Sequence, residues 1–231
     1  MKILGVIGGI GPESTIDYYR AIINTFRERQ PDAGYPPIII NSIDLARLRA
    51  WMEAADYPPV VEYLVEELGR LARAGAEFAL MSANSPHIVF DQLRERSPIP
   101  LLSIVQTTCD AARQLGLTRL ALIGTRFTMQ GHFYSDVFRR AGLALVVPEA
   151  EEQTFIHEKY FEELVLGKFL PETREALCAI IRNMKKRDAI DGVILGGTEL
   201  PLILTGDQID GMPLLDTTRI HVNAAIEYMI A

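Results

Sequence analysis

Two turns in this sequence place small and hydroxyl-bearing or amide-bearing residues directly after apolar runs. Residues 78–87 (FALMSANSPH) lead into Ala83, Asn84 and Ser85, and residues 192–200 (GVILGGTEL) lead into Gly197 and Thr198. Backbone amides at such turns, together with hydroxyl and amide side chains, are suited to binding a carboxylate. The same residue types also cap turns in proteins that bind no ligand, so local turn capping is the alternative interpretation.

Residues close to these turns could carry protons. His87 ends the first stretch, and histidine is the usual proton carrier near neutral pH, so His87 is the first candidate for a base. An equally good interpretation is that His87 hydrogen-bonds the backbone and fixes its turn. Glu199 could act as an acid or base, or it could cap the helix that follows. His221 is expected on a loop, and Asp216 is expected to cap a helix.

Sequence motifs of several other enzyme classes are absent or incomplete. The stretch GGIGPEST (8–15) has Gly9 and Gly11 but Ser14 where a dinucleotide-binding loop has its third glycine, and Pro12 lacks an amide hydrogen. No GxxxxGK[ST], HExxH, GxSxG or SxxK motif occurs, and no histidine pair has the spacing of metal ligands. We therefore expect neither a nucleotide site nor a metal site.

Composition and charge narrow the class of protein further. The 231 residues are 48% hydrophobic and 23% charged, with a formal net charge of −7, which argues against a nucleic-acid partner. No apolar run has the length of a membrane span, and the apolar start MKILGVIGG reads as a first strand, so we expect no membrane partner and a cytoplasmic location. Cys109 and Cys178 lack metal-ligand spacing and are expected to be small buried hydrophobic residues.

Apolar runs alternate with amphipathic segments along the whole chain. Segments rich in Ile, Val and Leu predict strands at 2–8, 36–43, 78–83, 100–105, 119–124, 144–148, 192–197 and 213–216. Helices are predicted at 13–30 and 59–76, the first with Ile16, Tyr19, Ile23 and Phe26 on one face. This alternation predicts an α/β fold with mostly parallel sheets.

The pattern also repeats at about half the chain length. Gly197 follows Ala83 by 114 residues, and Gly124 follows Gly8 by 116. Two similar α/β halves explain these offsets, although any α/β protein repeats strands at comparable intervals. We expect residues 1–98 plus 210–231 to form the first α/β domain and residues 99–209 the second.

Five motifs in order resemble the aspartate/glutamate racemase family. They are GVIGGIGPESTIDYY near the start, ANSPH (83–87), LIGTRFTM (122–129), GGTEL (196–200) and DTTRIHVNAA (216–225). The resemblance extends over the whole chain with similar spacing. It implies two pseudo-symmetric α/β domains with the active site in the cleft between them, and a homodimer. It also implies removal and return of a proton at an amino-acid α-carbon without pyridoxal phosphate, metal or any other cofactor.

The chain departs from the family at the two positions that matter most for this chemistry. The resemblance implies a cysteine at each turn, one thiolate removing the α-proton and the opposite thiol returning one. Ala83 and Gly197 stand at these positions and cannot carry a proton, so the two-thiol mechanism is unavailable. Different replacements at the two positions indicate natural divergence rather than deliberate removal. Neither Cys109 nor Cys178 is expected on a cleft loop.

The resemblance also implies a set of substrate-binding residues. Asn84, Ser85 and Thr198 match positions that hold the substrate's α-carboxylate and amine. Arg47, in NSIDLAR, matches an arginine that pairs with the side-chain carboxylate, and Lys168 is a weaker candidate for the same region. For Arg47 and Lys168 the alternative is an ordinary solvated side chain.

Three functions remain open on the sequence alone. The first is an amino-acid racemase-type isomerase that acts on an acidic amino acid with proton carriers other than thiols. The second is a lyase or decarboxylase-like relative, and the third is a non-catalytic binder of acidic amino acids. All three predict a small acidic amino acid or dicarboxylate as the ligand.

Overall fold

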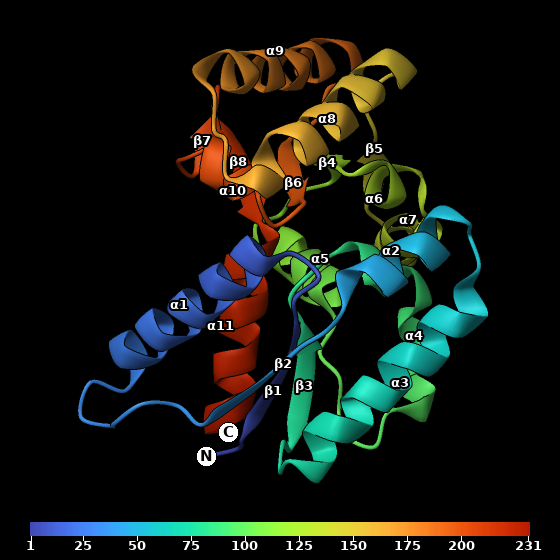
Figure 1. Cartoon of the computed structure of the whole chain (residues 1–231). Coiled ribbons are helices and arrows are strands. Elements are labelled where there is room, and N and C mark those ends of the chain that lie inside the picture. Colours follow the sequence, from blue (N-terminus) through green and yellow to red (C-terminus); the bar gives the residue numbers. More distant parts are fainter. The chain divides into compact units, whose positions relative to one another are not determined.

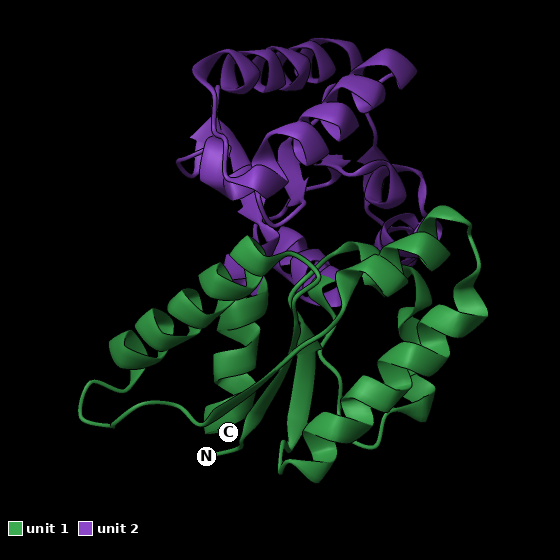
Figure 2. Cartoon of the chain, viewed as in Figure 1, with its two compact units in different colours: residues 1–104, 221–231 green, residues 105–220 purple.

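A computed structural model describes residues 1–231, and the chain divides into two compact units (Figure 2). Unit 1 comprises residues 1–104 and 221–231, and unit 2 comprises residues 105–220. The second boundary lies later than position 209 because strand β8 (Met212–Asp216) pairs with strand β6 (Gly192–Gly196) of unit 2. Each unit is an alternation of strands and helices (Figure 1).

Unit 1 contains a three-stranded parallel sheet in the order β2-β1-β3. Its strands are β1 (Leu4–Gly8), β2 (Ile38–Ser42) and β3 (Phe78–Met81). Its helices are α1 (Pro12–Arg29), α2 (Leu45–Glu53), α3 (Tyr57–Arg73), the 3-10 helix η1 (Ser85–Val89), α4 (Phe90–Arg96) and most of α11 (Thr217–Ile230).

The core of unit 1 joins the two ends of the chain. Helices α1 and α11 lie side by side, and their buried side chains pack together with those of β1 and β3 (Figure 1). On α1 the buried apolar residues are Tyr18, Ile22 and Phe26, whereas Ile16 and Tyr19 are half exposed. The buried stripe has a four-residue spacing, so the predicted face was wrong at Ile16 and Tyr19, whereas Ile23 is half-buried and Phe26 is buried.

Unit 2 contains a five-stranded sheet in the order β5-β4-β6-β8-β7, parallel except for the last pair. Besides β6 and β8, its strands are β4 (Arg119–Gly124), β5 (Ala144–Val146) and β7 (Gln208–Ile209). Its helices are α5 (Ile104–Gln114), α6 (Arg126–Gln130), α7 (His132–Arg140), α8 (Ala150–Glu162), the 3-10 helix η2 (Leu164–Leu166), α9 (Pro171–Asp188) and α10 (Leu200–Ile203).

The two sheets repeat one topology. In each unit the first strand of the repeat lies centrally, with the next strand on one side and the third on the other, as β2-β1-β3 and β5-β4-β6. The structure thus confirms the α/β class with mostly parallel sheets. In unit 2, helices α8, α9 and α10 pack against β4 and β6 around a shared hydrophobic core.

One predicted strand is not formed. Residues 100–105 make only an isolated parallel bridge, between Leu101 and Ala79, and the chain enters helix α5 at Ile104. A short apolar run is compatible with either element, so periodicity alone did not distinguish them. No helix of the chain combines the length and apolar character required to cross a membrane.

Candidate functional site

The first turn, residues 83–87, follows β3 and leads directly into η1. Ala83 and Asn84 are buried and Ser85 is half-buried. The carbonyl of Asn84 accepts a hydrogen bond from the backbone N–H of His87 at 3.0 Å. The turn therefore places Asn84 and Ser85 at the carboxyl end of a parallel strand, where ligands bind in α/β folds.

Hydroxyl groups tie the neighbouring strand ends of unit 1 together. The amide of Gly9 donates to Thr15 Oγ1 at 2.9 Å, and Thr15 Oγ1 lies 3.3 Å from Ser82 Oγ, which donates to the carbonyl of Ile7 at 3.1 Å. Gly9 has φ +79°, and a Cβ there would lie 2.6 Å from Ser42 Oγ, so this position requires glycine. Gly9 thus allows close packing of the chain after β1 within unit 1.

Both ring nitrogens of His87 form hydrogen bonds with the backbone. Its Nδ1 donates to the carbonyl of Ala83 at 3.1 Å, and its Nε2 accepts from the amide of Ile104 at 3.2 Å. Burial, with a smaller contribution from His221, lowers the pKa of His87 to about 3. The imidazole is therefore neutral near pH 7 with no nitrogen left for a substrate, which favours the turn-fixing interpretation.

His221 lies inside helix α11, not on a loop as the sequence predicted. Its Nε2 donates to the carbonyl of Leu102 at 3.3 Å, and its Nδ1 accepts from the hydroxyl of Tyr18 at 3.0 Å. Burial lowers the pKa of His221 to about 4. Asp216, just before this helix, accepts from the amide of Arg219 at 3.0 Å and is the expected cap.

The second turn, residues 197–199, follows β6 and is buried. Thr198 Oγ1 donates to Glu199 Oε2 at 2.9 Å, and the hydroxyl of Tyr160 donates to the same carboxylate oxygen. Helix α10 begins after Glu199 without a hydrogen bond from its side chain, so Glu199 does not act as the cap. Tyr160, Thr198 and Glu199 form a buried polar cluster in unit 2.

Gly197 is in contact with the ring of Tyr160. A Cβ at this position would lie 2.5 Å from Cε2, 2.9 Å from the hydroxyl oxygen and 3.0 Å from Cζ of that ring. The backbone of Gly197 is not left-handed, so the ring rather than the backbone excludes a side chain. No sequence signal points to Tyr160, because nothing in HEKYFEEL distinguishes it from an ordinary core tyrosine.

Arg47 lies on α2 between two aromatic rings. Its guanidinium carbon is 5.0 Å from the ring centre of Tyr63 and 5.3 Å from that of Trp51. These residues line a hollow of about 650 Å³ in unit 1, together with Pro58, Pro59, Glu62 and Glu66. Arg47 forms no ion pair with a carboxylate of the chain. The rings orient an exposed cation that is available to an anionic partner.

Lys168 lies after η2 and is exposed. Its amide donates to the carbonyl of Glu163 at 2.9 Å. The pKa of Glu163 is lowered chiefly by hydrogen bonds from Lys159 and Thr173, with a small contribution from the charge of Lys168. These contacts connect Lys168 with the η2 region of unit 2 and with none of the other predicted site residues.

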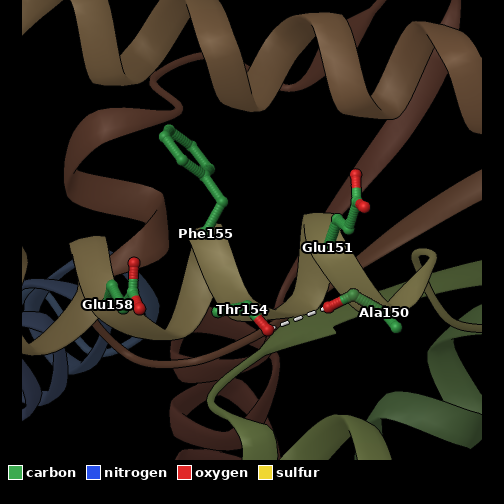
Figure 3. A pocket seen from close by; sticks show the side chains of 5 residues that line it. All are labelled: Ala150, Glu151, Thr154, Phe155 and Glu158. Atoms are coloured by element: carbon green, nitrogen blue, oxygen red, sulfur yellow. Dashed lines mark hydrogen bonds between the residues drawn. The ribbon is translucent and has the colours of Figure 1, made fainter.

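A second hollow, of about 380 Å³, lies along α8 (Figure 3). It is lined by Ala150, Glu151, Thr154, Phe155 and Glu158, and Thr154 Oγ1 donates to the carbonyl of Ala150 at 3.0 Å. Its two carboxylates and lack of a basic residue make it unsuited to an acidic ligand.

Cys109 and Cys178 are buried on helices α5 and α9, as expected. Burial raises the pKa of both thiols, so each is protonated near neutral pH and a poor nucleophile. No three His, Cys, Asp or Glu side chains in residues 1–231 are arranged to hold a metal ion.

Comparison with known proteins gives consistent matches along the chain. The model of the Asp/Glu/Hydantoin racemase family matches residues 7–225. The structure of an aspartate racemase homologue from Pyrococcus horikoshii is 33% identical, with a TM-score of 0.87 and all of both chains covered. A Yersinia pestis protein, described provisionally as an Asp/Glu racemase, is 31% identical, with a TM-score of 0.91 and the same coverage. A broad specificity amino-acid racemase of Bacillus subtilis is 21% identical over 165 residues, which are 70% of this chain and 67% of that protein.

Proposed function

This chain belongs to the Asp/Glu/hydantoin racemase family, and we propose that it is a racemase-type isomerase that acts at the α-carbon of an acidic amino acid. The observation that carries the proposal is the agreement of fold and sequence with racemase structures over the whole chain. The similarity to a broad specificity amino-acid racemase supports an amino-acid substrate. The descriptions of these relatives favour an isomerase over the lyase and the non-catalytic binder.

The substrate-binding residues of the proposal come from the two turns and from α2. Asn84 and Ser85 follow β3, and Thr198 follows β6, where backbone amides and hydroxyls are suited to an α-carboxylate or amine. Arg47 is assigned to the side-chain carboxylate, because aromatic rings hold it and no carboxylate of the chain neutralises it. Lys168 is the weakest member of the set.

The proposed reaction exchanges the α-proton without pyridoxal phosphate. Removing this proton leaves an electron pair that the substrate's own carboxylate delocalises, so the protein must orient the substrate and provide a proton carrier. Thiols are absent from positions 83 and 197, and the hydrogen bonds of His87 leave it no free nitrogen. Glu199 remains the acid–base candidate among the predicted site residues.

We further propose a homodimer and a cytoplasmic location. Ile16 and Tyr19 of α1 are 52% and 49% exposed, which supports this helix as part of the interface.

Titration calorimetry and enantiomer analysis test the proposal together. Purified protein is titrated with L- and D-Asp and with L- and D-Glu, and the same mixtures are followed by chiral chromatography. We expect binding of at least one of these acids and appearance of the opposite enantiomer. Binding without any interconversion would reduce the function to that of a binder, and absence of both would reject acidic amino acids as substrates.

A further inference from the structure

We propose that the hydroxyl of Tyr160, paired with Glu199, is the proton-carrying group of the second turn. This inference rests on the proposed isomerase function and names the group that replaces a side chain at position 197. Tyr160 is then a catalytic residue, and Glu199 acts through it.

Space is the first ground for this assignment. The hydroxyl oxygen of Tyr160 lies 2.9 Å from the place where a Cβ of residue 197 would be, and Cε2 lies 2.5 Å from it. A functional group carried by a side chain at 197 would therefore occupy the region that the phenol now fills. The ring reaches the turn from α8 (Ala150–Glu162), so a different element of unit 2 supplies the group.

The hydrogen bonds of the cluster are the second ground. Tyr160 is 6% exposed and Glu199 3% exposed, and the phenol donates to the Glu199 carboxylate. Thr198 donates to the same oxygen at 2.9 Å, so two hydroxyls converge on one carboxylate oxygen. A buried phenol joined to a buried carboxylate is a two-member path for a proton, and it ends at the turn that follows β6.

The direction of proton movement follows from the protonation state of the phenol. Burial, followed by the charge of Glu199, raises the pKa of Tyr160 well above its usual range, so the phenol is protonated at rest and a free tyrosinate beside the carboxylate is disfavoured. A proton transfer in which Tyr160 gives up its phenolic proton as it gains another avoids forming this tyrosinate.

A proton relay through Tyr160 to Glu199 avoids the tyrosinate and conserves protons and electrons. The α-hydrogen moves as a proton to the Tyr160 oxygen while the phenolic proton moves to Glu199, and the electrons of the broken C–H bond remain on the substrate. Glu199 becomes neutral and Tyr160 is again a phenol. Return of a proton reverses both movements, and exchange of the Glu199 proton with water in between labels the substrate with solvent hydrogen.

The first turn offers no comparable group. Ala83 has only a methyl group, and the nearby His87 is held by the backbone of Ala83 and Ile104. We therefore expect one enantiomer of the substrate to exchange its α-hydrogen with solvent faster than it inverts.

Three single substitutions test the relay in D₂O, with α-deuterium incorporation followed by proton NMR. Tyr160→Phe keeps the ring beside Gly197 and removes the hydroxyl. Glu199→Gln keeps an oxygen that can accept from Tyr160 but cannot take up its proton. Tyr134→Phe is the matched control, because Tyr134 is a fully buried tyrosine of unit 2 that is hydrogen-bonded to Thr108 and is not among the nearest neighbours of Gly197.

We expect Tyr160→Phe and Glu199→Gln each to lower the maximal exchange rate about 100-fold, the lower end of the usual general acid–base contribution. The KM should change less than threefold and the Tyr134→Phe variant should exchange like the wild type. If Tyr160 and Glu199 had only a structural role, their substitution would instead lower the exchange rate, the melting temperature and the binding affinity together. Wild-type exchange with an undiminished rate in Tyr160→Phe would overturn the relay and leave the isomerase function intact. A wild type that binds but never exchanges would contradict the isomerase function and the relay with it.

Discussion

Gly197→Ala is the most direct structural perturbation of the second turn. The added Cβ would lie 2.5 Å from Cε2 of Tyr160. Because carbon atoms pack at about 3.5–4.0 Å, the ring must move by about 1 Å. Overpacking a core in this way costs about 1–3 kcal/mol. Misaligning the hydrogen bond from Tyr160 to the buried Glu199 carboxylate costs about 1.5–3 kcal/mol more. The two costs add to about 2.5–6 kcal/mol, and because the shifted hydrogen bond is weakened and not abolished, we expect the free energy of unfolding to fall by about 3 kcal/mol, toward the lower end of that range.

The destabilisation by Gly197→Ala should disappear when the ring of Tyr160 is removed. In a Tyr160→Ala background the same Gly197→Ala change has no ring to displace, and the backbone at this position is not left-handed. We expect a change within about 0.5 kcal/mol, or a small gain of about 0.4–1 kcal/mol from the reduced freedom of the unfolded chain. Gly34→Ala is the control, because a Cβ there would meet no atom within 4 Å.

Urea denaturation followed by circular dichroism measures all four members of this double-mutant cycle. The expected coupling between positions 160 and 197 is about 2–4 kcal/mol, which exceeds the usual error of additivity. If Gly197→Ala were as stable as the wild type, or equally destabilising with and without the ring, the contact between Gly197 and Tyr160 would not explain the glycine.

Other parts of the structure lead to three further predictions. Burial lowers the pKa of His87 to about 3 and that of His221 to about 4, below the ordinary 6.5, so as the pH falls the unfolded chain binds protons before the folded one does. The free energy of unfolding should therefore drop by up to about 1.4 kcal/mol per pH unit for each histidine below about pH 6. A urea midpoint that stays constant down to pH 4.5 would contradict this. Asn84→Ala should weaken calorimetric binding of the acidic amino acid about 10- to 100-fold, as expected for one hydrogen bond to a charged group, and an unchanged Kd would remove Asn84 from the proposed site. Tyr19→Glu should shift sedimentation toward the monomer, whereas an unchanged dimer would place the interface elsewhere.

Most strands could be predicted from the sequence, because parallel strands that are covered on both faces consist of unbroken apolar runs. Seven of the eight predicted strands are formed, and the failure at 100–105 is an apolar run that the structure divides between a bridge and the start of a helix. The apolar face of α1 was misplaced because both Tyr18 and Tyr19 could belong to a buried stripe. Only packing against α11 and the sheet decides between them.

The site was less accessible to sequence reasoning, because its chemistry depends on a contact between distant segments. The turns themselves were found from small and polar residues that follow strands. Tyr160 lies on α8, 37 residues before Gly197, and no local spacing connects the two. In the sequence, Gly197 indicated only the loss of a proton-carrying side chain. In the structure, Gly197 leaves room for the ring of Tyr160. His87 was similarly ambiguous until its two backbone partners were known.

The central claim is that this protein ionises the α-carbon–hydrogen bond of an acidic amino acid. The measurement that tests it most directly is a proton NMR time course of L- and D-Asp and of L- and D-Glu with the wild-type protein in D₂O. We expect the α-proton signal of at least one of the four to be lost while the amount of amino acid stays constant. An α-proton signal that persists for days in all four, with binding demonstrated in the same samples, would contradict it.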